Sequence, residues 1–240
     1  MYALFFLLWA LSLGTSLLID LEWIAEEPFQ NLPSLKLTSS FVLVLTAIYT
    51  AWCTRNGARK IALLIALGML LGFLGDCAMA NLFRFFPNRV LGGMLFFGLG
   101  HLAYIAACLL VKKRDAMASD TAWWQAILAW QMVGLFIWWQ VVFSSDKPPA
   151  LHLPALAYGA LLAATAGLMT ALALHKSSYW PAALGAALFL FSDGVLAWEI
   201  FHESQPVTRF LVWATYGPGQ MLIVFGFAYA IHIFWSKPKA

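Results

Sequence analysis

Long apolar runs are the feature that most constrains the fold of this chain. Eight of them recur along its 240 residues, and each is long enough to cross about 30 Å of hydrocarbon as a helix. The expected spans cover residues 2–19, 34–53, 60–83, 90–111, 121–143, 153–174, 179–201 and 209–235. Only 10% of the residues are charged, against about a quarter in soluble domains. We therefore expect an all-α, polytopic membrane bundle of eight transmembrane helices, with residues 1–240 forming a single transmembrane domain.

Lysine and arginine residues are distributed unevenly between the two ends of this expected bundle. Nine lie at the helix ends that share a side with the termini, and four lie at the opposite ends. Because cytoplasmic loops are enriched in these residues, the distribution places both termini in the cytoplasm. We expect an integral protein of the bacterial inner membrane. The net charge of +3 is dispersed, so no basic tract indicates a nucleic-acid partner.

Two aspartates lie inside almost purely apolar segments, Asp76 in LLGFLGDCAMANLF and Asp193 in LFLFSDGVLAWEIF. Each is about eight residues from the end of its apolar run. A carboxylate at that depth costs about 3 kcal/mol or more unless it is paired or hydrated. One interpretation is that each caps a kinked helix or pairs with a cation. The interpretation we favour is a shared site, in which one carboxyl holds a proton and the other is ionised, giving a general acid and a general base.

Other polar side chains enter the bundle from the same end as the aspartates. His101 follows two glycines, and Tyr104 shares its helical face at i+3. Lys36 lies in the first turn of the second span. His101 could be a hydrogen-bonded structural residue, and Lys36 could simply extend toward water. As functional residues, they would bind a substrate, with Lys36 near a phosphate or neutralising one aspartate.

The last span carries Tyr216 and Gln220 on one face, around a Gly-Pro-Gly sequence at 217–219. This sequence predicts a break in the helix, which membrane proteins tolerate where a cavity is lined. We therefore expect both side chains to contribute to the site.

Asp76, Asp193 and His101 could form a metal site of two aspartates and one histidine, but no HExxH motif or zinc-type cysteine spacing accompanies these residues. The chain also lacks a GxSxG elbow, a Walker loop and a dinucleotide fingerprint. We therefore expect neither a metal nor an organic cofactor.

A weak internal repeat is visible when Asp76 is aligned with Asp193. The same alignment pairs Leu71 with Leu188 and Ala80 with Ala197. It would divide the bundle into two four-helix halves of the same orientation and bring the aspartates together near a pseudo-twofold axis. Independently, the small-xxx-small spacing of Gly68 and Gly72 predicts close packing of the third span against a neighbour.

At these residues the chain resembles the lysoplasmalogenase family of integral membrane proteins, also called the YhhN family. The matching segments are Leu35-Lys36-Leu37, Leu74-Gly75-Asp76, Gly100-His101-Leu102-Ala103-Tyr104, Gly185-Ala186-Ala187-Leu188-Phe189 through Ser192-Asp193, and Tyr216 with Gln220. Two departures, Leu37 in place of the expected proline and the proline of the 217–219 sequence, affect local helix geometry more than the chemistry.

The resemblance implies a hydrolase that cleaves the vinyl ether of single-chain phospholipids, releasing a fatty aldehyde and glycerophosphoethanolamine or glycerophosphocholine. The two aspartates suit this reaction, which needs a desolvated acid and a nearby carboxylate. Three alternatives stay open: a proton-coupled transporter, a structural membrane subunit, and another lysophospholipid hydrolase that uses metal-bound water.

Overall fold

The computed structural model describes residues 1–25, 33–146, 149–202 and 205–235. Within these residues, eight helices are long and apolar enough to cross a membrane, as the sequence predicts. They are α1 (Tyr2–Ala25), α2 (Pro33–Cys53), α3 (Arg59–Met79), α4 (Arg89–Arg114), α5 (Thr121–Ile137), α6 (His152–His175), α7 (Trp180–Phe201) and α8 (Pro206–Trp235). The protein is therefore an all-helical integral membrane protein.

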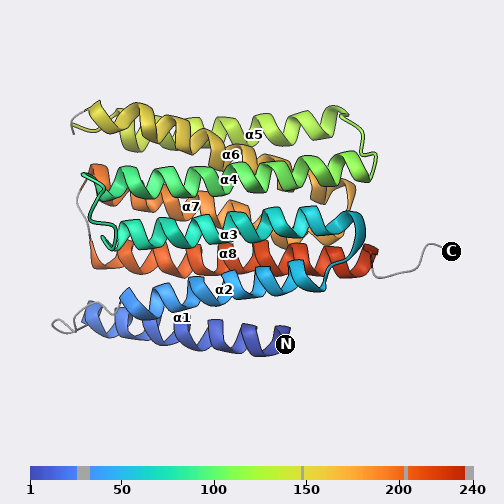
Figure 1. Cartoon of the computed structure of the whole chain (residues 1–240). Helices are drawn as coiled ribbons and strands as arrows, with labels where there is room; N and C mark the ends of the chain where they lie inside the picture. Colours follow the sequence, from blue (N-terminus) through green and yellow to red (C-terminus); the bar gives the residue numbers. More distant parts are fainter. Residues whose placement is uncertain (26–32, 147–148, 203–204, 236–240) are drawn as a thin grey trace.

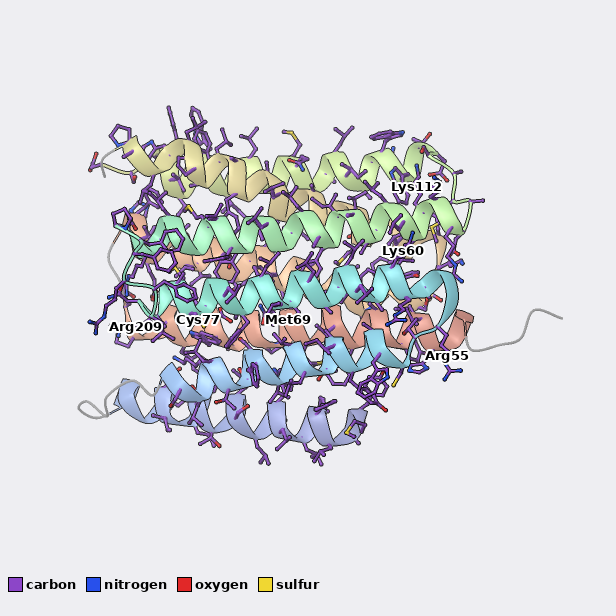
Figure 2. All side chains as sticks on the ribbon, in the orientation of Figure 1. Arg55, Lys60, Met69, Cys77, Lys112 and Arg209 are labelled. Atoms are coloured by element: carbon purple, nitrogen blue, oxygen red, sulfur yellow. The ribbon has the colours of Figure 1, made fainter. Side chains whose placement is uncertain are left out.

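The helices lie side by side in one bundle, and α1 begins at the same end of it at which α8 finishes (Figure 1). The pairs α1–α2 and α5–α6 form opposite edges, and α3, α4, α7 and α8 lie between them. Figure 2 shows Arg55, Lys60 and Lys112 at the end where α1 begins, and Arg209 at the other. Cys77, the neighbour of Asp76, lies toward the Arg209 end, which we call the distal end.

Two helix ends differ from the sequence prediction in ways that affect the site. α3 stops at Met79 rather than at residue 83, so Asp76 lies in its last turn instead of two turns below the end. Asn81 adopts a left-handed φ of 59°, and the Leu82 and Asn81 amides bond back to the Cys77 and Ala78 carbonyls. This is a Schellman end, which asparagine tolerates better than most residues.

The end of α5 also departs from a regular helix. The segment Trp138–Phe143 continues it as a π-helix. Such wide turns are rare and are often found next to functional sites. Here the segment packs against α7 and α6, so it forms part of the wall around the interior of the distal half.

The predicted break at residues 217–219 is wrong, because α8 runs without interruption through Pro218. The two glycines serve close packing instead. A Cβ on Gly219 would lie 2.9 Å from the Gly185 carbonyl oxygen, and one on Gly217 would lie 2.5 Å from a Leu13 methyl. Only glycine lets the backbones of α7 and α8 approach this closely.

The same glycine contact recurs between α3 and α4, where a Cβ on Gly100 would lie 2.9 Å from the Gly68 carbonyl oxygen. Gly68 precedes Asp76 by eight residues, and Gly185 precedes Asp193 by eight. The two halves also contact each other in a matching way, since α4 packs on α6 and its counterpart α8 packs on α2. The close packing predicted for α3 is confirmed, and the paired contacts support two four-helix halves related by a pseudo-twofold axis.

Candidate active site

Asp76 is held at the distal end of α3 by two residues of α8. Its side chain is only 6% exposed. The Tyr216 hydroxyl donates a hydrogen bond of 2.7 Å to Asp76 Oδ1, and Gln220 Nε2 donates one of 2.5 Å to the Tyr216 oxygen. The structure therefore brings together three residues singled out from the sequence. Ser40 of α2 also interacts with the Asp76 carboxyl, although among the described side chains none is within hydrogen-bonding distance and angle of Asp76 Oδ2.

Glycines on α3 make this arrangement possible. The Gln220 amide lies over Gly72, where a Cβ would be 3.1 Å from Nε2. The Phe97 ring of α4 covers Gly75 so closely that a Cβ there would be 2.7 Å from the ring. Because these two positions lack side chains, residues of α8 and α4 reach the backbone around Asp76.

Asp193 lies on α7, two turns before Phe201, where the helix ends. It is partly exposed, and the Tyr158 hydroxyl of α6 donates a hydrogen bond to its Oδ2. Tyr158 was not predicted as a site residue. A sequence signal existed, because it is a single tyrosine beside a glycine in an apolar helix, the same context that drew attention to His101 and Tyr104.

The two carboxyl groups interact electrostatically, but their hydrogen bonds go to different partners. Within the described part of the chain, no hydrogen bond joins Asp76 to Asp193, and each carboxyl has its own tyrosine. The sharing of one proton between the two carboxyls stays a prediction. The carboxyls line two adjoining cavities, and Met79 and Leu196 line both of these cavities.

The cavity that includes Asp76, here called the polar cavity, carries charged groups of both signs. Lys36 Nζ forms an ion pair of 2.8 Å with Asp20 Oδ2 and lies 5.5 Å from the centre of the Trp213 ring. The charged residues that line this cavity are Asp20, Lys36, Asp76, Arg89, Glu199 and Arg209. Lys36 therefore lies at the site, but its partner is Asp20 rather than one of the two intramembrane aspartates.

The cavity that includes Asp193, here called the apolar cavity, is bounded by the end of α3, α4, α5, the π-helical segment, α6 and α7. Apart from the Asp193 carboxyl and the Tyr158 hydroxyl, its side chains are hydrocarbon, aromatic or thioether groups, with the indole of Trp138 among them. The Trp138 Nε1 donates to the His152 carbonyl at 2.9 Å, so this polar group is satisfied. The cavity presents a surface suited to a hydrocarbon chain.

His101 and Tyr104 are buried in the same bundle but line neither of these two cavities. His101 Nδ1 lies 3.0 Å from the Thr165 hydroxyl oxygen. That hydroxyl donates to the Leu161 carbonyl, so Nδ1 must be the donor toward it. Tyr104 covers Gly68, where a Cβ would lie 2.3 Å from the ring. Their assignment as substrate-binding residues stays a prediction.

Asp76, Asp193 and His101, the possible metal ligands in the sequence, do not form a cluster of ligands in the described part of the structure. Across the described ranges, no three histidine, cysteine, aspartate or glutamate side chains are close enough together to hold a metal ion. His101 turns toward Thr165 and the Phe189 ring. The three cysteines, Cys53, Cys77 and Cys108, are free thiols.

Fold and site together define a polytopic membrane protein with two intramembrane carboxyl groups at the junction of a polar and an apolar cavity. The chain belongs to the YhhN family, whose model matches residues 35–227. All the elements that build the site lie within or overlap that range, apart from α1, which supplies Asp20.

Curated relatives agree with this family. The chain is 30% identical over 155 residues to a rat protein named lysoplasmalogenase TMEM86B, covering 65% of this chain and 59% of the relative. It is 28% identical to the mouse protein of that name, covering 65% and 62%, and 32% identical to the pig protein, covering 57% and 53%. The matches thus span about three fifths of the rat and mouse proteins. No solved structure shows a significant match.

Proposed function

We propose that this protein is a lysoplasmalogenase, a membrane hydrolase that cleaves the vinyl ether of a single-chain ether phospholipid. The observation that carries the proposal is the position of Asp76 and Asp193, one on each of two adjoining cavities of opposite polarity. The curated relatives named lysoplasmalogenases support it. The products would be a fatty aldehyde and glycerophosphoethanolamine or glycerophosphocholine.

The proposed chemistry uses only the two carboxyl groups and water. One aspartic acid protonates the vinyl carbon remote from the ether oxygen, which leaves an oxocarbenium ion. The other carboxylate stabilises the positive charge and takes a proton from the water that adds to the carbon bonded to oxygen. The hemiacetal then collapses: its hydroxyl proton is lost, the bond to the glycerol oxygen breaks, and that oxygen is protonated. One water is consumed for each aldehyde.

The hydrogen-bonding partners have a positioning role in this mechanism. Tyr216, itself oriented by Gln220, holds Oδ1 of Asp76, so that Oδ2 would take part in the proton transfer. Tyr158 does the same for one oxygen of Asp193. Lys36, which forms an ion pair with Asp20, would contact the phosphate. If the termini are cytoplasmic, as the lysine and arginine distribution favours, the polar cavity faces the outer side of the bacterial inner membrane.

The test is incubation of the purified protein with lysoplasmenylethanolamine, with detection of both aldehyde and glycerophosphoethanolamine. A lysophospholipid with an ester-linked chain should stay intact, which separates this activity from a lysophospholipase. In heavy water the aldehyde should carry a single deuterium on the carbon next to the carbonyl, because that carbon receives the proton. Release of fatty acid from the ester, or aldehyde without deuterium, would contradict the proposal.

A further inference from the structure

The polar cavity combines charges in a way that matches a zwitterion. Lys36, Arg89 and Arg209 supply positive charge, and Asp20 and Glu199 supply negative charge beside them. Glu199 accepts a hydrogen bond of 2.5 Å from Thr208, and Lys36 is paired with Asp20, so these groups are held in place. Arginine and lysine bind phosphate oxygens, while carboxylates attract an ammonium group. A phosphoethanolamine or phosphocholine carries both.

The apolar cavity adjoins it at the level of the two aspartates. Met79 and Leu196 line both cavities, so they mark the junction. A molecule that extends from one cavity into the other passes these residues with Asp76 on one side and Asp193 on the other. In a single-chain ether phospholipid, the vinyl ether is the bond between the polar head and the hydrocarbon chain, and it would lie at this junction.

We propose that the two cavities divide the substrate between them: the zwitterionic head group occupies the polar cavity and the hydrocarbon chain occupies the apolar cavity. This inference rests on the proposed function for its choice of ligand. It assigns Arg89 as a residue that selects for the phosphate. It also assigns Ile137 and Gly159 as residues that set the length of chain accepted.

The geometry of the apolar cavity supports the choice of these two residues. α6 contributes Ala155, Tyr158, Gly159 and Leu162 to the lining, a spacing of i, i+3, i+4 and i+7 that forms one helical face. A Cβ on Gly159 meets nothing within 4 Å, so a larger side chain there enters space rather than displacing a neighbour. On the α5 side, Ile137 lies 3.3 Å from where a Cβ of Gly194 would be, directly opposite α7 next to Asp193.

The placement of head group and chain in separate cavities is tested by measuring the binding of ligands that the protein cannot cleave. The ligands are 1-alkyl lysophospholipids of short, medium and long chain, which lack the vinyl group and are not cleaved, and the matching 1-alkylglycerols, which lack the phosphate. The Kd of each is measured for the wild type and its variants by native mass spectrometry in detergent, and the same proteins are assayed for aldehyde release.

For the chain, Gly159→Val should weaken binding of the long-chain ligand by about tenfold or more relative to the short one. Ile137→Ala should shift the preference in the opposite direction, toward longer chains. Because the two variants act in opposite senses, a general loss of fold cannot imitate the result. If both variants change all chain lengths equally, or change none, the assignment of the chain to the apolar cavity is overturned.

For the head group, Arg89→Gln should weaken binding of the phospholipid about tenfold and leave the alkylglycerol unchanged. Arg84→Gln is the matched control, since Arg84 is exposed at the same end and does not line the polar cavity. Equal effects of Arg89→Gln on both ligands, or none, overturn the head-group assignment. If the wild type binds in the pattern proposed but releases no aldehyde, the proposed function fails while the division of the ligand stands.

Discussion

Asp76 and Asp193 occupy equivalent positions of the repeat and each accepts a hydrogen bond from a tyrosine, yet their burial and the cavities they border differ. Asp76 is buried, is held by Tyr216 of α8 and borders the polar cavity. Asp193 is partly exposed, is held by Tyr158 of α6 and borders the apolar cavity. Two aspartates at equivalent backbone positions of the repeat therefore have different environments.

The difference can be followed to residues on α4 and α8. Relative to the glycines that make the close contacts, Tyr216 is three residues before Gly219 and Phe97 is three before Gly100. Phe97 thus stands where the other half has a hydroxyl, and its ring packs on Tyr216 at 6.0 Å between centroids. The hydroxyl for Asp193 comes from a different helix. Asp76 therefore borders a cavity lined by several charged groups, and Asp193 borders one lined mainly by hydrocarbon.

The largest effect that would test this contrast is the loss of either carboxyl. We expect Asp76→Asn and Asp193→Asn each to lower aldehyde release by about 10²–10⁴-fold, as removal of a general acid or base does. The loss should be greater for Asp193→Asn, because the Tyr158 hydroxyl, the other acidic group that lines the apolar cavity, is a much weaker acid than a carboxyl, whereas Asp76 borders a cavity with further charged groups. Initial rates at saturating lysoplasmalogen measure this.

The control for both variants is Asp146→Asn, which removes an exposed carboxyl at the same end of the bundle and should leave the rate unchanged. Size-exclusion profiles establish that the variants are folded. Near-normal turnover in either intramembrane variant would mean that the carboxyl pair is not the catalytic unit.

The two tyrosines should respond differently to removal of the hydroxyl. Tyr216→Phe takes a donor from Asp76 and also leaves the Gln220 amide, which is 1% exposed, without its acceptor. Tyr158→Phe removes one hydrogen bond beside a cavity. We expect both to lower turnover about tenfold, and only Tyr216→Phe to lower the free energy of unfolding by about 1–3 kcal/mol. Thermal unfolding in detergent separates them, and equal stability losses would contradict the contrast.

The sequence predicts the architecture well, because membrane crossing depends on apolar length, and all eight helices are present among the described residues. It also predicts Asp76, Tyr216 and Gln220 as residues of one site. The predicted end of α3 lies too far along the chain, because residues after Asn81 are again apolar. A single asparagine is a weak signal for a helix end within such a pattern. The effect of Pro218 was predicted wrongly because helix packing around Gly185 and Gly219, not local propensity, decides it.

What the sequence could not give is the separation of the carboxyls into two cavities. That depends on which helices lie beside α3 and α7. Tyr158 reaches Asp193 only because α6 packs on α7, and the Lys36–Asp20 pair forms only because α1 and α2 pack together. His101 and Tyr104 share a face as predicted, but that face turns toward Thr165 and Met69.

A smaller effect tests whether the halves are equivalent in their packing, as opposed to their chemistry. Gly100→Ala and Gly219→Ala each put a Cβ 2.9 Å from a carbonyl oxygen of the facing helix. We expect similar destabilisation by both, about 1–3 kcal/mol, because a backbone contact cannot give way as a side chain can. Gly14→Ala, which meets nothing within 4 Å, is the control and should be close to neutral. A loss in one half alone would argue against the repeat.

The smallest effect concerns His101, which takes the place in α4 that Gln220 takes in α8, one residue after the close-contact glycine. Gln220 donates to the hydroxyl oxygen of Tyr216, whereas His101 donates from Nδ1 to Thr165 and its Nε2 has no partner in the described part of the chain. In His101→Asn the side-chain amide nitrogen replaces Nδ1 and keeps this hydrogen bond, while Nε2 is lost. If His101 only joins α4 to α6, kcat and KM should both stay within about twofold, a change of less than 0.5 kcal/mol. A clear rise in KM with unchanged thermal stability would instead make His101 a substrate contact, as the sequence predicted, and would bring the two halves closer in function than their cavities indicate.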